Sequence, residues 1–178
     1  MYLKKIVSKS LSLGPFPILL VLVLLAEQVK AGEHNLTFAV SGVVSSVKVK
    51  IGDEVKVGTI LAVLDLTPFN AAKRSSEAAT DLAKFIFTLS KVRLEHAQKL
   101  FDALSTSGEE LEKAKIEYAK ALSGYKIAKS HAEIAIWQLR QATLKAPFIG
   151  IVSAIPGYPG MVINNNGISQ PVVVVNKK

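Results

Sequence analysis

Histidine offers this chain the widest choice of chemistry, because an imidazole can bind a metal ion or transfer a proton near neutral pH. The sequence has three histidines, His34, His96 and His131, which lie far apart along the chain. It has no cysteine, which excludes a disulfide framework and thiolate metal sites. No Gly-rich phosphate loop follows a strand, and no Ser elbow motif is present. The residue types therefore predict a protein that is not an enzyme, with no catalytic residue, no cofactor and no metal.

The elements that would position these residues are dominated by the stretch from Pro68 to Thr143, which predicts two long helices folded against each other. In its second half, uncharged residues recur at alternating three- and four-residue steps, as in a coiled-coil seam. In its first half, Leu82, Phe85, Leu89 and Val92 predict the facing seam, and Ala97, Leu100 and Leu104 follow in a shifted register. The seam of the second half comprises Leu111, Ala114, Tyr118, Ala121, Tyr125, Ala128, Ala132, Ala135, Leu139 and Ala142.

Local signals predict where each helix begins. Thr67 is expected to be the N-cap of the first helix, with Pro68 at the first helical position, where its missing N–H costs nothing. Ser107 and Glu110 form a capping-box pattern that starts the second helix. Because the tip between the helices is short, they must run antiparallel as a projecting hairpin. This pairing keeps the histidines apart, so no metal site is expected.

Residues 1–31 have the pattern of an export signal. A basic start precedes an apolar run from Phe16 to Ala26, and Val29-Lys30-Ala31 resembles a small-residue cleavage site. The run has about 11 residues, fewer than the roughly 20 that a membrane-spanning helix needs. We expect export with cleavage after Ala31, and the alternative is an uncleaved membrane anchor.

The net charge of +8 does not predict a nucleic-acid partner. Part of it belongs to the lysines of residues 1–31, and the remaining basic residues are mixed with acidic ones along the helices. No basic stripe is interleaved with aromatic residues, as a nucleic-acid surface would require.

Both sides of the hairpin carry short β-type sequences. After the hairpin, Ala146-Pro147 is expected to end the second helix, residues 149–155 and 172–175 predict strands, and Asn166-Gly167 predicts a tight turn. Neither flank has enough strands to bury its apolar face alone, so we expect an α+β fold in which the flanks form one small β-sandwich. Before the hairpin, Val43, Val47, Val49 and Ile51 alternate with Lys48 and Lys50, which predicts a half-buried strand.

Two half-motifs in these flanks resemble a known family. Residues 40–47 and the stretch Ile51-Gly52-Asp53-Glu54-Val55 through Asp65 look like the first half of the lipoyl-like domain of periplasmic adaptor proteins, also called membrane fusion proteins of the HlyD and AcrA type. Residues 144–152 and 160–162 resemble the second half. The resemblance implies a small lipoyl-like β-sandwich, or barrel-sandwich hybrid, split by a long antiparallel α-helical coiled-coil hairpin. It divides the chain into a signal peptide at 1–31, a first half at 32–66, the hairpin at 67–144 and a second half at 145–178.

The resemblance also implies partners and a site. Such adaptors act in the periplasm of Gram-negative bacteria as homo-oligomers, and they couple an inner-membrane transporter of the RND or ABC type to a TolC-like outer-membrane channel in tripartite efflux or secretion systems. At the hairpin tip, Leu100 and Ser107 match the family motif, His96 stands at the position of its Arg, and Arg93 lies on the same helical face. These four are the predicted partner-binding residues. Structural turns or close packing are expected at Gly52, Gly58, Pro147, Gly150 and Gly160.

Three alternatives remain open. Family members usually carry a β-barrel domain and often a membrane-proximal domain, which this chain is expected to lack, so it could be a minimal, truncated or split adaptor. Lipoyl and biotinyl carriers share the half-motifs, but the hairpin replaces their modified turn, and Lys73 and Lys84 are not expected to carry a group. The alternative function is a periplasmic coiled-coil spacer or a non-functional adaptor fragment. Nothing indicates the transported substrate.

Overall fold

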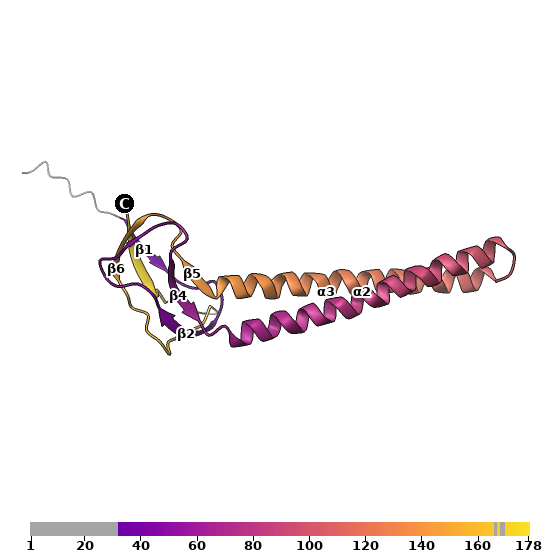
Figure 1. Ribbon diagram of the computed structural model, residues 1–178, viewed down its shortest axis with the longest axis horizontal. Coiled ribbons are helices and arrows are strands. Elements are labelled where there is room, and N and C mark those ends of the chain that lie inside the picture. The colour runs from indigo at the N-terminus through magenta and orange to yellow at the C-terminus, as the bar shows by residue number, and fades with distance from the viewer. Residues whose placement is uncertain (1–31, 166, 168–169) are drawn as a thin grey trace, which may run out of the picture. The chain divides into compact units, whose positions relative to one another are not determined.

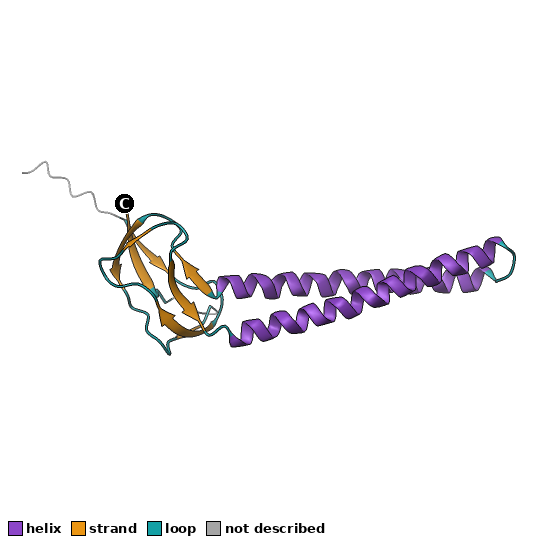
Figure 2. Ribbon diagram, in the orientation of Figure 1, coloured by secondary structure: helices purple, strands orange, loops and turns teal. Residues whose placement is uncertain are grey.

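The computed structural model describes residues 32–165, 167 and 170–178, which belong to one unit. The predicted signal peptide and Asn166 of the predicted tight turn lie outside the described residues. The fold is α+β, with two long helices and two antiparallel sheets (Figures 1 and 2). The elements are β1 (Glu33–Leu36), β2 (Gly42–Val47), β3 (Glu54–Val55), β4 (Ile60–Leu64), α2 (Thr67–Asp102), α3 (Gly108–Gln141), β5 (Thr143–Lys145), β6 (Gly150–Ala154), β7 (Val162–Ile163) and β8 (Val173–Lys177).

Each sheet combines strands from before and after the helices. One sheet has the order β1-β8-β6-β3 and the other β5-β4-β2-β7, with antiparallel pairing throughout. Both sheets contribute to one apolar core, since neither flank could bury its strands alone. The largest fully buried side chains of this core are Phe38, Leu61, Leu64, Val44, Val55, Val152, Val172, Val173 and Val175.

The alternation predicted for the first flank is only partly correct. Val47 and Val49 are half-buried, but Val43 and Ile51 are exposed and Val44 is buried. The reason is a break in the register of β2 against β4 between Val44 and Ser46, where an extra residue shifts the side-chain alternation. A strict period of two therefore assigns Val43 to the wrong face.

Two of the predicted helix boundaries are wrong. The N-cap of α2 is Leu66 rather than Thr67, and it makes no side-chain capping bond. The carboxylate of Asp65 accepts a hydrogen bond from the backbone N–H of Thr67 at 2.9 Å, so an acidic side chain stabilises the exposed helix start. At the other end, α3 stops at Gln141, before Ala146-Pro147, because β5 pairs with β4 there.

Helices α2 and α3 pack side by side in antiparallel directions (Figure 1). Phe87 of α2 lies between two α3 rings, with centroids 5.5 Å from Tyr118 and 5.8 Å from Tyr125. Further along, the Thr80 hydroxyl donates to the Ala128 carbonyl at 3.1 Å. Every residue predicted for the α3 seam, from Leu111 to Ala142, is buried or half-buried, which confirms the periodicity of the second helix.

The seam predicted for α2 is wrong. Leu82, Phe85, Leu89 and Val92 are all exposed. The residues of α2 that are shielded against α3 are mostly small or polar, and they include Thr80, Ala83, Phe87, Ser90, Leu94 and Ala97. Small side chains allow two helix backbones to approach closely, so the larger apolar residues are left on the outer face of α2.

Glycine permits a close backbone contact between β6 and β8. A Cβ atom at Gly150 would collide with the backbone carbonyl oxygen of Asn176 and with a methyl group of Val175. Gly52, Gly58 and Gly160 have positive φ angles of 93°, 86° and 91°, as tight turns often require.

Candidate partner-binding site at the tip of the helix pair

The tip opens with a Schellman motif at the end of α2 in which leucine takes the position usually held by glycine. The N–H of Leu104 donates to the Phe101 carbonyl at 2.9 Å, and the N–H of Ser105 donates to the Leu100 carbonyl at 2.8 Å. Leu104 has a φ of 54°, the only positive φ of a non-glycine residue in the described part of the chain. Its side chain is 93% exposed. A strained and fully exposed leucine therefore forms the outermost apolar group of the tip.

Ser107 starts α3 on the other side of the tip. Its Oγ accepts a hydrogen bond from the backbone N–H of Glu110 at 3.2 Å, which is the first half of the predicted capping box. The Glu110 carboxylate accepts a hydrogen bond from Lys113 at 3.0 Å, and residues 100–113 contain no return bond to the Ser107 N–H. Capping alone thus accounts for Ser107, and its side chain points into its own helix start.

Three of the four predicted tip residues line one groove. Arg93, His96 and Leu100 contribute its α2 wall, and residues of the α3 start, including Ala114, contribute the other wall. The groove has a volume of about 430 Å³. Ser107 lies outside it, so the predicted set divides into a groove and a separate helix cap.

Charged groups border this groove. Arg93 pairs with Glu117 across the two helices at 3.8 Å, and both side chains are more than half exposed. Lys113 lies 3.0 Å from both Glu109 and Glu110. The hydrogen bond to Glu110, followed by the one to Glu109, raises the pKa of Lys113 above its usual range. The groove therefore combines apolar side chains with charged and polar ones, a mixture that is also found at protein–protein interfaces.

The apolar groups of the tip are Leu100, Phe101 and Leu104, all exposed. The sequence predicts Leu100 as a binding residue and Leu104 as part of the α2 seam, and it gives no signal for Phe101. The signal that could have identified Leu104 is the missing glycine: the chain reaches a helix end and a new cap at Ser107 without a Gly or Asn at the C′ position.

The described residues also bear on two other kinds of site. In residues 32–165, 167 and 170–178, no three His, Cys, Asp or Glu side chains are close enough to hold a metal ion. Within the same residues, neither long helix is apolar enough over a sufficient length to cross a membrane.

Part of the sequence is similar to a curated protein. The uncharacterized protein YdhJ of Escherichia coli strain K12 is 28% identical over 127 residues, which cover 71% of this chain and 44% of YdhJ. The chain therefore spans less than half the length of the curated relative that it matches. No protein-family model matches the sequence.

Solved structures give the fold comparison. The membrane fusion protein Spr0693 from Streptococcus pneumoniae R6 matches with a TM-score of 0.64 and 20% identity, covering 82% of this chain and 59% of that one. A MacA-MexA chimera containing the Pseudomonas aeruginosa MexA α-hairpin domain matches with a TM-score of 0.58 and 23% identity. The match covers 82% of this chain and 46% of the chimera. The periplasmic adaptor protein EmrA matches with a TM-score of 0.57 and 18% identity. The match covers 82% of this chain and 72% of EmrA.

These matches confirm the predicted resemblance to membrane fusion proteins, or periplasmic adaptors, at the level of the fold. Two of these neighbours are described as a membrane fusion protein and a periplasmic adaptor protein.

Proposed function

We propose that this chain is a periplasmic adaptor subunit that couples an inner-membrane transporter to a TolC-like outer-membrane channel in an efflux or secretion system. The tip of the helix pair meets the channel, and the two sheets belong to the part that packs with other copies and with the transporter. The protein acts by assembly and positioning, without a chemical step of its own. It reaches the periplasm through the export signal at 1–31.

One observation carries this proposal: the helix pair is inserted between two flanks that complete each other's sheets, and this arrangement recurs in adaptor structures. We accordingly assign the sheets at 32–66 and 145–178 to a lipoyl-like sandwich and residues 67–144 to a coiled-coil hairpin. Fold likeness alone does not fix function, so the site must support it as well. The support from the site is the exposed apolar tip, where Leu100, Phe101 and Leu104 present a surface that no other described element covers.

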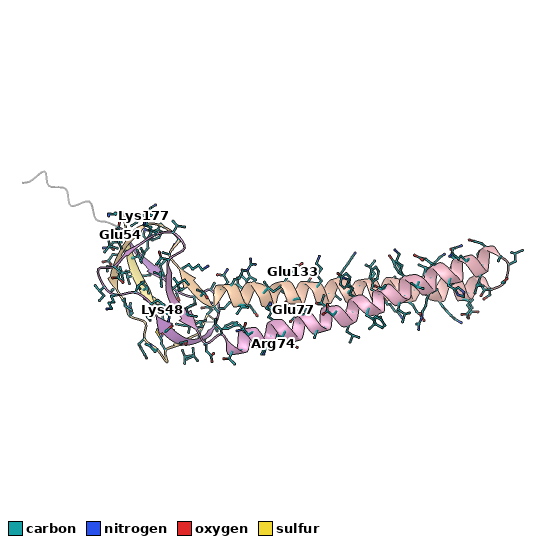
Figure 3. All side chains as sticks on the ribbon, viewed as in Figure 1. Lys48, Glu54, Arg74, Glu77, Glu133 and Lys177 are labelled. Atoms are coloured by element: carbon teal, nitrogen blue, oxygen red, sulfur yellow. The ribbon has the colours of Figure 1, made fainter. Side chains whose placement is uncertain are left out.

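Site-specific crosslinking tests the proposal, because the sequence has no cysteine. A single cysteine is placed at Leu100 in the full chain, which is expressed in its native host. A short thiol-to-amine crosslinker is added to intact cells, and captured proteins are identified by mass spectrometry. We expect Leu100→Cys to capture an outer-membrane channel. The matched control is Arg74→Cys, which lies on the same helix in the half next to the sheets (Figure 3) and should not capture it.

The outcomes separate the candidate functions. Capture of the channel at Leu100 and not at Arg74 supports docking through the tip. Capture of only other copies of this chain, in cells that contain a TolC-like channel, would contradict it and favour the spacer or fragment alternative. A second measurement is export of a transported compound: Leu104→Ala should reduce it by at least tenfold while the helix content, measured by circular dichroism, stays unchanged.

A further inference from the structure

A cleft lies where the helix pair joins the sheets (Figure 1). Its walls come from the segment between β1 and β2, from β4 and β5, and from the ends of α2 and α3 next to the sheets. The cleft has a volume of about 710 Å³. Small-molecule sites in proteins typically measure roughly 300–1,000 Å³. Elements far apart in the sequence therefore form one concavity of the size that a small organic molecule fills.

The charged groups of this cleft are all cationic. Arg140 and Lys145 line it and are exposed, whereas no Asp or Glu contributes to its lining. Within the described part of the chain, neither cation makes an ion pair, unlike Lys73 and Lys91, which each pair with a glutamate one turn away. Arg140 lies in the last turn of α3, where a cation complements the helix dipole, but this does not account for Lys145 in β5. Two unpaired cations are therefore available to an anion.

Amide and hydroxyl groups add hydrogen-bond donors to the cleft. Asn70 of α2, Gln141 of α3 and Thr37 all contribute to its walls. Among the side-chain polar atoms that the structure describes, only Oγ1 of Thr37 and Oδ1 of Asn176 are buried without a hydrogen-bond partner. An unpaired buried hydroxyl is costly, and an acceptor held in the neighbouring cleft would remove that cost.

The rest of the lining is mainly apolar. Ile60, Leu66 and Leu139 contribute aliphatic side chains, and Ile60 is 44% exposed. Leu144 also lines the cleft and belongs to the buried core, so part of the wall is the edge of that core. Aliphatic side chains beside two cations suit a molecule with an apolar chain and an anionic group, because each part meets matching chemistry.

We propose that this cleft binds a free amphipathic organic anion, such as a medium-chain carboxylate. Its acidic oxygens lie near Arg140 and Lys145, and its chain covers Ile60, Leu66 and Leu139. Bound there, the molecule contacts both flanks and both helices, so it holds the base of the helix pair to the sheets. The cleft lies at the opposite end of the helices from the tip, and the proposal does not rest on channel docking.

Calorimetric titration of the full chain tests this site. The probe is decanoate below its critical micelle concentration. One control is decyltrimethylammonium, which has a chain of the same length and a cationic head, and the other is acetate, which has the head without the chain. We expect decanoate to bind saturably and at least tenfold more tightly than either control. It should also raise the thermal unfolding temperature, because it binds the folded chain.

Variants of the cleft locate the binding. Replacing both cations, by Arg140→Gln with Lys145→Gln, should weaken decanoate binding at least tenfold. The matched control, Lys48→Gln with Lys126→Gln, makes the same change of charge at two exposed lysines outside the cleft and should leave the affinity within twofold. Ala39→Phe fills the cleft from an exposed position and should lower the affinity at least fivefold. Circular dichroism should show the same helix content in every variant.

Three results would overturn the proposal: no saturable decanoate binding, equal binding of the cationic control, or undiminished binding by the double cleft variant. Co-sedimentation with phosphatidylglycerol vesicles that only the cleft variant loses, without decanoate binding, would also overturn it and assign the cleft to a lipid surface. Leu104→Ala at the tip should bind decanoate as tightly as the unmodified chain, so failure of channel docking and failure of this site are distinguishable.

Discussion

At the residue scale, Leu104 combines a strained backbone with complete exposure of its side chain. A left-handed conformation costs a non-glycine residue roughly 1–2 kcal/mol, so Leu104→Gly should raise the free energy of unfolding by about 1 kcal/mol. Urea denaturation followed by circular dichroism measures this change. Leu104→Ala keeps the Cβ and should leave stability within about 0.5 kcal/mol of the unmodified chain.

The same pair of variants separates stability from docking. If Leu104 contacts the channel, cells with either variant should export less of the transported compound. Only the glycine variant should gain stability. A glycine variant that is less stable than the unmodified chain would contradict the strain argument, since Gly is the preferred residue at the C′ position of a Schellman motif.

Asp65 gives stability that depends on pH. The hydrogen bonds from Thr67, the backbone N–H first, lower the pKa of Asp65 below its model-compound value of 3.8. A carboxyl group with a lowered folded-state pKa stabilises the fold above its unfolded pKa and loses that effect as the pH falls through the folded pKa. Thermal unfolding of the unmodified chain and Asp65→Asn should therefore differ most above about pH 5 and converge toward about pH 2. A difference that stays constant over this range would contradict the assignment.

At the element scale, the two neighbouring phenylalanines of α2 test which face is packed. Phe87 lies between Tyr118 and Tyr125, whereas Phe85 is 66% exposed. We expect Phe87→Ala to lower the free energy of unfolding by about 2–3 kcal/mol, below the value for a fully buried Phe. Phe85→Ala should change it by less than about 0.5 kcal/mol. The measurement is urea denaturation followed by circular dichroism. A reversed order of the two variants would support the α2 seam predicted from sequence.

The contrast between the two helices shows what periodicity can predict. The α3 seam could be predicted because alanines, tyrosines and leucines recur there without a charged residue, and that stripe is the one that packs. On α2, the strongest apolar stripe lies on the outside and the packed stripe contains Thr80, Ala83 and Ser90. Hydrophobic periodicity identifies an apolar face, but it does not say whether that face meets the same chain or another.

At the tip and in the first flank, two details could not be predicted from the sequence, for other physical reasons. Arg93, His96 and Leu100 could be grouped because residues three and four apart share a helical face, and they do line one groove. Leu104 was missed because its role follows from backbone geometry at the helix end. Val43 was assigned to the wrong face because a bulge leaves no mark in a simple alternation.

At the scale of the whole described chain, the sheets hold the helix pair at its base. The strand that leads into α2, β4, pairs directly with the strand that follows α3, β5. The other sheet joins β1 and β3 of the first flank to β8 and β6 of the second. The far ends of the helices are joined by the short tip, and packing between α2 and α3 sets their spacing along the rest of their length. The base of the helix pair consequently depends on closure of both flanks.

Gly150 tests that dependence, because a side chain there would collide with β8. Gly150→Ala should lower the free energy of unfolding by about 1–3 kcal/mol, the usual cost of overpacking. Hydrogen exchange should locate the loss in β1, β3, β6 and β8, including the strands of the first flank, with smaller changes in the middle of α3. The control is Gly124→Ala, where the added methyl meets open space and helix propensity predicts a gain of roughly 0.5–1 kcal/mol. Loss of protection confined to residues 150–177 would mean that the first flank holds its fold without the second, and that the sheets do not close as one unit.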